Sequence, residues 1–305
     1  MKKNNQKATL IGSIAVLLWS TLALFTTQAN LVPPLLLLTL TFSVASVLFF
    51  LVYALKGELR RSWEQTPKSA ILMGGLGFYF YHFFYFYAFQ HASPVEAGLI
   101  AYLWPLFIVL MAGMTKGNSL SWTHLVGAAV AFVGTGIMLQ SKGYTDDSIV
   151  NEAYDWTGYG AAFACALIWS SYSVANRRYH SVPSSSVLWY CIVTTLLAGI
   201  SHLVLEESFF ENYGRSFPIE TWIAILGLGL GPVGMAFFCW DFGVKKGNLS
   251  LLGVLAYTAP ALSTVWLGFF TDAQLTTGQI IACILITAGA LFASLMPNKK
   301  IPSTL

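Results

Sequence analysis

Gly98-Leu-Ile-Ala-Tyr-Leu-Trp-Pro105 recurs later in the chain as Gly253-Val-Leu-Ala-Tyr-Thr-Ala-Pro260. Both stretches follow the pattern Gly-x-x-Ala-Tyr-x-x-Pro, so the four shared residues fall at i, i+3, i+4 and i+7, on one face of a helix. Each stretch lies between long uncharged flanks, which favours helices that cross a membrane. The repetition predicts two symmetry-related helices that meet at a functional site.

The two prolines of this motif should interrupt their helices. A proline cannot donate a hydrogen bond to the carbonyl four residues earlier, which leaves the carbonyls of Ala101 and Ala256 under-bonded. At membrane depth such a group is costly unless it faces protein or a wet cavity. Two packing kinks are the alternative, since Gly and Pro are common in membrane helices. The predicted gating residues are Pro105, Pro260, Gly98 and Gly253.

The composition excludes a soluble globular protein. The chain has 305 residues, of which 56% are hydrophobic and 10% charged, and its mean hydropathy is +0.66. An uncharged gap at 8–55 holds two spans of about 20 residues each. Eight more uncharged gaps follow at 69–95, 97–115, 117–141, 156–176, 179–205, 221–240, 247–271 and 273–298. The predicted fold is an all-α membrane protein with ten transmembrane helices.

The basic residues predict the orientation of these spans. With the N-terminus in the cytoplasm, only Lys142 and Arg215 of the 16 Lys and Arg residues fall on the opposite side. Both termini are therefore expected in the cytoplasm. The apolar run after Lys7 is interpreted as the first span, because a cleaved signal peptide would leave nine helices.

A second pair of motifs extends the repeat. Trp19-Ser-Thr21 in the first span matches Trp169-Ser-Ser171 in the sixth. Each half then has five helices, and because five is odd the second half must insert inverted. The predicted units are a first repeat at 1–141, an extracytoplasmic linker at 142–155 and an inverted repeat at 156–305. An inverted repeat with interrupted helices is typical of transporters whose site lies near the midplane.

The third span carries one aromatic face. Phe78, Tyr81, His82 and Tyr85 follow helical spacing, and His82 is the one ionisable residue placed deep within a span. Such residues are functional candidates, although a neutral histidine bonded to a neighbouring helix is an equal alternative. Asp241 lies nearer the end of its span and is interpreted as interfacial, paired with Lys245 at i,i+4.

Aromatic residues at mid-span cannot belong to an interfacial belt, although packing against lipid can also explain them. The predicted substrate-binding residues are Trp19, Ser20, Tyr81, His82, Tyr85, Tyr102, Trp104, Trp169, Ser170 and Tyr257. With no carboxylate, Lys or Arg at mid-span, a neutral zwitterion fits better than a charged substrate. Its ammonium would bind freed carbonyls and a ring such as Trp19, and serine or tyrosine hydroxyls would bind its carboxylate.

Three motifs carry a family resemblance: Gln6-Lys-Ala-Thr-Leu-Ile-Gly12, Tyr102-Leu-Trp-Pro105 and Ala166-Leu-Ile-Trp169. On these motifs the chain resembles the drug/metabolite transporter superfamily of the EamA type, and within it the bacterial exporters of aromatic amino acids. The resemblance runs from about Gln6 to Leu295. It implies a central cavity, export of aromatic and other neutral amino acids by alternating access, and a place in the bacterial inner membrane.

Two other classes of function fit the sequence less well. Efflux of cationic drugs or metabolites is the alternative, but small relatives use a carboxylate in their first helix and residues 8–28 hold no acid. An intramembrane enzyme would need a nucleophile and base, two carboxylates or a metal cluster, and one deep histidine with scattered cysteines does not supply these. The prediction is therefore no enzyme, no metal and no cofactor. The predicted partners are a small-molecule substrate and the bilayer, without nucleic acid, in a monomer or weak homodimer.

Overall fold

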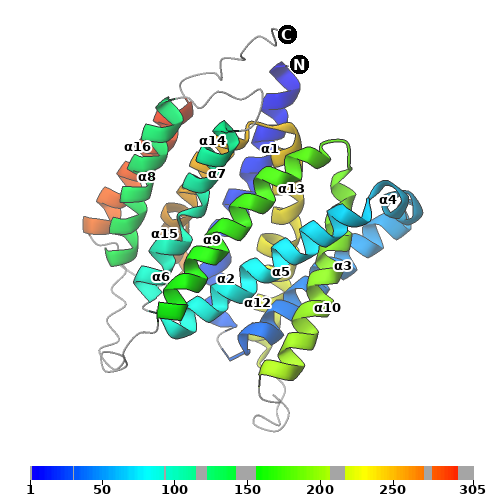
Figure 1. The fold of residues 1–305 in the computed structure, drawn as a ribbon. Helices are drawn as coiled ribbons and strands as arrows, with labels where there is room; N and C mark the ends of the chain where they lie inside the picture. Colours follow the sequence, from blue (N-terminus) through cyan, green and yellow to red (C-terminus); the bar gives the residue numbers. More distant parts are fainter. Residues whose placement is uncertain are drawn as a thin grey trace.

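The computed structural model describes residues 2–29, 31–92, 94–114, 122–141, 156–206, 217–270 and 277–294, and almost all of them are helical (Figure 1). Its main helices are α1 (Lys2–Ser20), α2 (Leu22–Gln28), α3 (Pro34–Leu55), α4 (Leu59–Gln65), α5 (Lys68–His91), α6 (Pro94–Ala101), α7 (Trp104–Gly113), α8 (Trp122–Ser141), α9 (Trp156–Asn176), α10 (Val187–Leu205), α12 (Ile219–Leu228), α13 (Ala236–Lys246), α14 (Leu249–Ala256), α15 (Thr258–Phe270) and α16 (Thr277–Ser294). Short 3₁₀ turns η2 (Arg177–Tyr179) and η3 (Ser184–Ser186) follow α9, and no strand occurs in the described ranges.

Four helical segments are long and apolar enough to cross a membrane by length and composition. They are Asn4–Thr26, Pro34–Leu55, Ser184–Leu205 and Ile219–Lys246, and shorter apolar helices occur at Trp122–Ile137 and Ile280–Gly289. The all-α fold and the apolar spans agree with the predicted membrane protein.

Both copies of the proline motif interrupt their helices, as predicted. A turn at Tyr102 and Leu103 separates α6 from α7, and a turn at Tyr257 separates α14 from α15. Pro105 thereby occupies the first turn of α7, where its missing N–H is not needed. Pro260 lies in the first turn of α15, but its side chain is outside the described residues.

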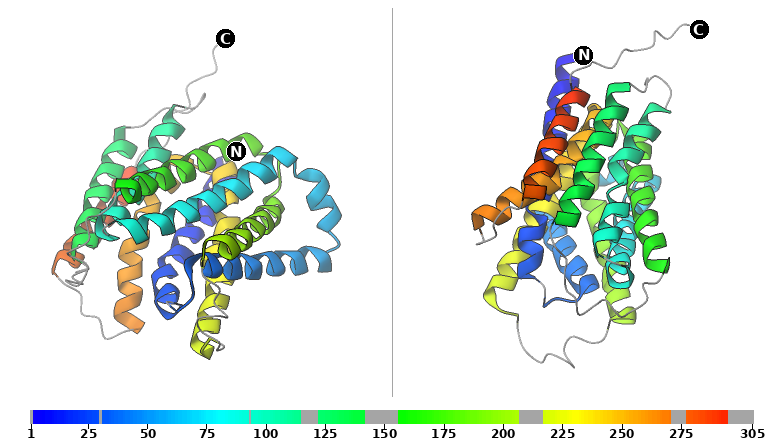
Figure 2. Two further views of the ribbon diagram at one scale, coloured as in Figure 1. Left: turned by 60° about the horizontal axis from the view of Figure 1, so that its bottom comes forward. Right: turned by 90° about the vertical axis from the view of Figure 1, so that its left-hand side faces the viewer.

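Helices from the first part of the chain pack against helices from the second part. The contacting pairs are α1 with α13, α3 with α10, α5 with α9, α7 with α14, and α8 with α16. Figure 1 shows α5 beside α9 and α8 beside α16. Figure 2 shows that α1 begins and α16 ends at the same end of the bundle. The core therefore forms between the two halves of the sequence.

Glycines permit the closest of these contacts. A Cβ on Gly12 of α1 would lie 2.9 Å from the Cα of Gly243 in α13, so the two backbones touch. A Cβ on Gly253 would lie 3.1 Å from the carbonyl oxygen of Pro105. The two motif stretches therefore contact each other directly, and Gly98 is buried in α6.

Gly158 and Gly160 of α9 provide a matched pair for testing this packing. A Cβ on Gly158 would lie 2.6 Å from the carbonyl carbon of His91, which is backbone, whereas a Cβ on Gly160 would have no neighbour within 4 Å. We expect Gly158→Ala to destabilise the fold by about 1–3 kcal/mol and Gly160→Ala to be neutral or slightly stabilising. Melting temperatures in detergent check this order, and equal melting temperatures would contradict the close contact.

The N-terminus of α3 is capped from another helix. The carboxylate of Glu206, at the end of α10, accepts hydrogen bonds from the N–H groups of Leu35 at 2.7 Å and Leu36 at 3.1 Å. Oε2 of Glu206, which accepts from Leu36, also lies 2.7 Å from Nδ1 of His202. A negative charge satisfies N–H groups that the helix itself leaves open and complements the helix dipole.

One segment departs from the regular helix that its sequence suggested. Between α12 and α13 the chain forms a π-helical stretch, η4 (Gly229–Met235), with Pro232 inside it. Proline removes one helical hydrogen bond, and π turns occur frequently at functional sites. A Cβ on Gly234 would overlap the carbonyl of Gly229, which explains the glycine at that position.

Candidate functional site

Aromatic rings from five elements meet in the interior. We define the ring cluster as the side chains of Trp19, Phe78, Tyr81, His82, Trp104, Trp169, Phe237 and Trp240. Trp19 of α1 contacts four of the other rings, with the ring centroids of Trp240, Trp169, Phe237 and Trp104 at 5.0, 5.9, 6.0 and 6.1 Å. Edge-to-face and tilted arrangements at these distances are the favourable ones for aromatic pairs.

The aromatic face predicted for the third span joins this cluster from α5. Phe78 lies 4.4 Å from Phe237, and Tyr81 lies 5.2 Å from Trp169, between ring centroids. Tyr85 stacks on Tyr81 at 6.1 Å and continues the same face. The helical spacing therefore identified the correct face of α5.

Two polar groups of the ring cluster bond to backbone carbonyls. The Trp19 indole N–H donates to the carbonyl of Pro232 at 3.0 Å, inside the π-helical stretch. Nδ1 of His82 lies 2.7 Å from the carbonyl of Phe78. Since a carbonyl only accepts, Nδ1 carries the hydrogen and Nε2 is the acceptor nitrogen of the neutral ring. The histidine bond thus lies within α5 and does not reach a neighbouring helix.

The hydroxyl groups of the two predicted serines, Ser170 and Ser20, form hydrogen bonds with other residues of the protein. Ser170 of α9 is fully buried, and its hydroxyl lies 2.9 Å from the carbonyl of Trp104 and 2.6 Å from that of Ala166. Ser20 accepts a hydrogen bond from the indole N–H of Trp266 in α15 at 2.8 Å. Ser170 thereby holds α9 against the start of α7, beside the interrupted helix.

The structure places two predicted residues outside the ring cluster. Tyr102 and Tyr257 pack with Val109, Ala131 and Ile286 in a separate apolar cluster beside α8 and α16. Tyr257 is fully buried there, with its ring centroid 6.4 Å from that of Phe132. The predicted site thus divides into two groups of residues.

Sequence reasoning missed four residues at or beside the ring cluster: Phe237, Trp240, Pro232 and Trp266. The dense aromatic stretch Phe237-Phe-Cys-Trp240 is the feature of the sequence that indicates an aromatic contribution from α13. Pro232 and Trp266 form hydrogen bonds with Trp19 and Ser20, which no spacing rule indicates.

The ring cluster differs in exposure across its members. Trp104 and Trp169 are buried, whereas Trp19, Tyr81 and His82 keep part of their surface exposed. All four cysteines are free, and Cys165 and Cys191 are buried.

Asp241 lies inside the protein, a burial that the sequence did not predict. Its side chain and that of Lys245 are fully buried, and Lys245 Nζ lies 2.9 Å from Asp241 Oδ1. The predicted i,i+4 pair is confirmed, but it lies in the interior, one residue beyond Trp240.

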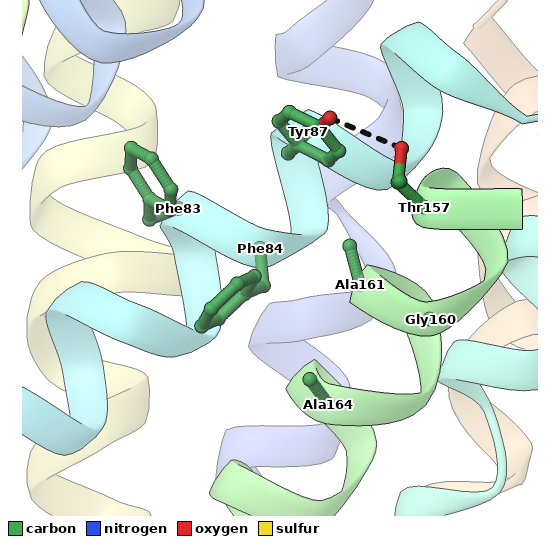
Figure 3. A pocket seen from close by; sticks show the side chains of 7 residues that line it. All are labelled: Phe83, Phe84, Tyr87, Thr157, Gly160, Ala161 and Ala164. Atoms are coloured by element: carbon green, nitrogen blue, oxygen red, sulfur yellow. Dashed lines mark hydrogen bonds between the residues drawn. The ribbon is translucent and has the colours of Figure 1, made fainter. Parts of the chain in front are cut away.

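A separate groove lies between α5 and α9 (Figure 3). Its volume is about 270 Å³, and it is lined by Phe83, Phe84, Tyr87, Thr157, Gly160, Ala161 and Ala164. The Tyr87 hydroxyl lies 3.1 Å from that of Thr157. None of the predicted site residues lines this groove, so it is distinct from the ring cluster.

Together the apolar helices, their interruptions and the interior ring cluster define a multi-pass helical membrane protein. The sequence model of the EamA-like transporter family matches residues 6–140 and again 156–295. The chain belongs to this family.

Relatives resemble it over almost their whole length. The aromatic amino acid exporter YddG of Ancylobacter novellus is 40% identical, over 97% of this chain and 100% of that protein. The aromatic amino acid exporter YddG of Escherichia coli is 26% identical, over 96% of this chain and 99% of its own. A crystal structure with 41% sequence identity superposes with a TM-score of 0.85, covering 95% of this chain and 98% of the other.

Proposed function

We propose that this protein exports aromatic and other neutral amino acids across the bacterial inner membrane. The ring cluster carries this proposal, because it presents aromatic surface from α1, α5, α7, α9 and α13 and contains no Asp, Glu, Lys or Arg. Two relatives that span the whole chain are named aromatic amino acid exporters.

The binding mode follows from the exposed members of the ring cluster. The faces of Trp19 and Tyr81 offer aromatic surface to a ring or long aliphatic side chain, and Trp19 adds a cation–π contact to an ammonium. Nε2 of His82 can accept a hydrogen bond from that ammonium. Tyr85, Ser20 and Ser170 hold these rings and the start of α7 in place. Tyr102 and Tyr257 would contact the substrate from the side of α8 and α16.

The pattern of helix pairs supports an inverted repeat of ten spans. The first half supplies α1 with α2, α3, α5, α6 with α7, and α8; the second supplies α9, α10, α12 with α13, α14 with α15, and α16. If each helix is replaced by its counterpart in the other half, the contact of α1 with α13 becomes the contact of α9 with α5, which is also present. The pairs α3–α10, α7–α14 and α8–α16 each remain the same pair. The double match of the family model supports repeats at 1–141 and 156–305; the linker at 142–155 lies outside the described residues.

Alternating access would use the interrupted helices. Turns at Tyr102 and Tyr257 separate short helices that can tilt, and Gly253 touches the carbonyl of Pro105 between them. Rocking of two repeats around a fixed site needs such joints. Pro105, Pro260, Gly98 and Gly253 therefore remain our gating residues, with both termini cytoplasmic and the protein a monomer or weak homodimer.

Transport competition tests the proposed substrate class. In proteoliposomes loaded with the purified protein, Phe, Trp, Tyr, Met and Leu should each inhibit uptake of labelled Phe. Lys, Asp and quaternary ammonium compounds should not, because burying an unmatched charge beside the rings is costly. Protein-free liposomes are the control. Inhibition or transport of quaternary ammonium compounds without transport of Phe would favour efflux of cationic drugs instead.

A further inference from the structure

A polar cluster lies at the end of the bundle where α1 begins. We define the Asp241 cluster as Asp241, Lys245, Asn176 and Ser186. Asp241 Oδ1 accepts from Lys245 Nζ at 2.9 Å and from Asn176 Nδ2 at 2.8 Å, and Lys245 Nζ also lies 3.4 Å from Ser186 Oγ. These contacts join α13 to the end of α9 and to η3. The backbone N–H of Asn248, just beyond α13, bonds to Thr9 of α1 and places the cluster at this end.

The Asp241 cluster has unused hydrogen-bonding capacity. Asp241 Oδ2 and Asn176 Oδ1 are buried and have no hydrogen-bond partner in the part of the chain that the structure describes. Both atoms are acceptors. Lys245 has three N–H groups, and its two contacts with Asp241 and Ser186 leave one available to another acceptor. The cluster can thus receive donors at two oxygens and offer a donor at one nitrogen.

Stability alone does not account for this arrangement. Burying an ion pair costs desolvation that its attraction does not reliably offset, and apolar replacements are often neutral or stabilising. Among the residues that the structure describes, Asp241 is the one acidic side chain that is fully buried. An ionisable group within a membrane segment therefore points to a function.

We propose that the Asp241 cluster is a second binding site for the zwitterionic backbone of an α-amino acid, used on the way to the ring cluster. This inference rests on the proposed function. The substrate ammonium would donate to Asp241 Oδ2 and Asn176 Oδ1, and its carboxylate would accept from Lys245. A zwitterion carries one charge of each sign, so it matches the ion pair without leaving a charge unpaired.

The position of the Asp241 cluster suits a loading site. Trp240 directly precedes Asp241, its ring lies 5.0 Å from Trp19, and its indole N–H donates to Ser173 of α9 at 3.1 Å. A molecule bound at the cluster would therefore lie next to the ring cluster. Because Asp241 and Lys245 are fully buried here, this end of the bundle must open before substrate enters.

Transport measured separately from each membrane face tests the site. We would compare labelled Phe transport in inside-out and right-side-out vesicles for Asp241→Asn, Lys245→Gln and the wild type. Loss of one charge-assisted hydrogen bond should raise the KM at the cytoplasmic face by about tenfold or more, while the KM at the opposite face changes by less than about twofold. Arg178→Gln, an exposed residue at the same end, is the matched control and should change neither.

Two substrate analogues separate recognition from a purely structural role. Phenethylamine lacks the carboxylate and 3-phenylpropionate lacks the ammonium. Each should still inhibit the wild type from the cytoplasmic face, because its single charge is matched there by Asp241 or Lys245, whereas a quaternary ammonium has no N–H to donate to Asp241. At the cytoplasmic face, Asp241→Asn should weaken inhibition by phenethylamine but not by phenylpropionate, and Lys245→Gln should do the reverse. Equal changes for both analogues or at both faces would overturn the second site. Unchanged KM values in variants that transport Phe would overturn it too, whereas a wild type that transports no Phe would overturn the proposed function with it.

Discussion

Replacing Trp19 by alanine should abolish amino acid transport and destabilise the fold by about 3–5 kcal/mol. Trp19 contacts four other rings of the cluster at centroid distances of 5.0–6.1 Å. Its removal opens a void among α1, α7, α9 and α13 that these large rings cannot close. It also removes exposed aromatic surface from the proposed substrate site.

Trp19→Phe separates these two effects. Phenylalanine keeps an aromatic ring but leaves the Pro232 carbonyl without its donor, at a cost of about 1–3 kcal/mol. We expect this variant to fold and to transport Phe at a clearly reduced rate. Trp222→Phe, on an exposed position of α12, is the control and should behave as wild type. Melting temperatures in detergent and labelled Phe uptake measure both effects, and normal transport by Trp19→Ala would refute the proposed role of this ring in the substrate site.

Asp241→Leu should be as destabilising as Trp19→Ala, at about 3–5 kcal/mol, because it leaves the Lys245 ammonium buried without its counter-charge. The double variant Asp241→Leu/Lys245→Met should recover most of this loss, since an apolar pair needs no hydration. The single variants Asp241→Leu and Lys245→Met and the double variant form a cycle that isolates the coupling energy between the two side chains.

Arg60 and Glu64 form the matched control for this cycle. They are also four residues apart, with Arg60 Nε 2.8 Å from Glu64 Oε1, but their side chains are 90% and 58% exposed. Water screens such a pair, so their coupling should stay within about 1 kcal/mol. Equal coupling energies for the two pairs would show that burial does not strengthen the interaction between Asp241 and Lys245. A stable double variant would also allow transport from the cytoplasmic face to be measured without a folding defect.

Several features of this protein follow from local sequence alone. The uncharged gaps predict apolar helices, and each Gly-x-x-Ala-Tyr-x-x-Pro stretch predicts the interruption found at Tyr102 and at Tyr257. The spacing of Phe78, Tyr81 and His82 predicts the face of α5 that joins the ring cluster. These predictions succeed because helical periodicity and the missing proline N–H act within one or two turns of the chain.

Other features depend on how the helices are rotated and paired, which only the tertiary structure decides. It places Tyr102 and Tyr257 beside α8 and α16, brings Phe237 and Trp240 against Trp19, and buries Asp241 with Lys245. In a membrane, lipid and protein interior are both apolar, so hydropathy does not distinguish the side of a helix that faces the core. The close contacts at Gly12 and Gly243, and the π-helical stretch around Pro232, settle those rotations through packing between distant segments.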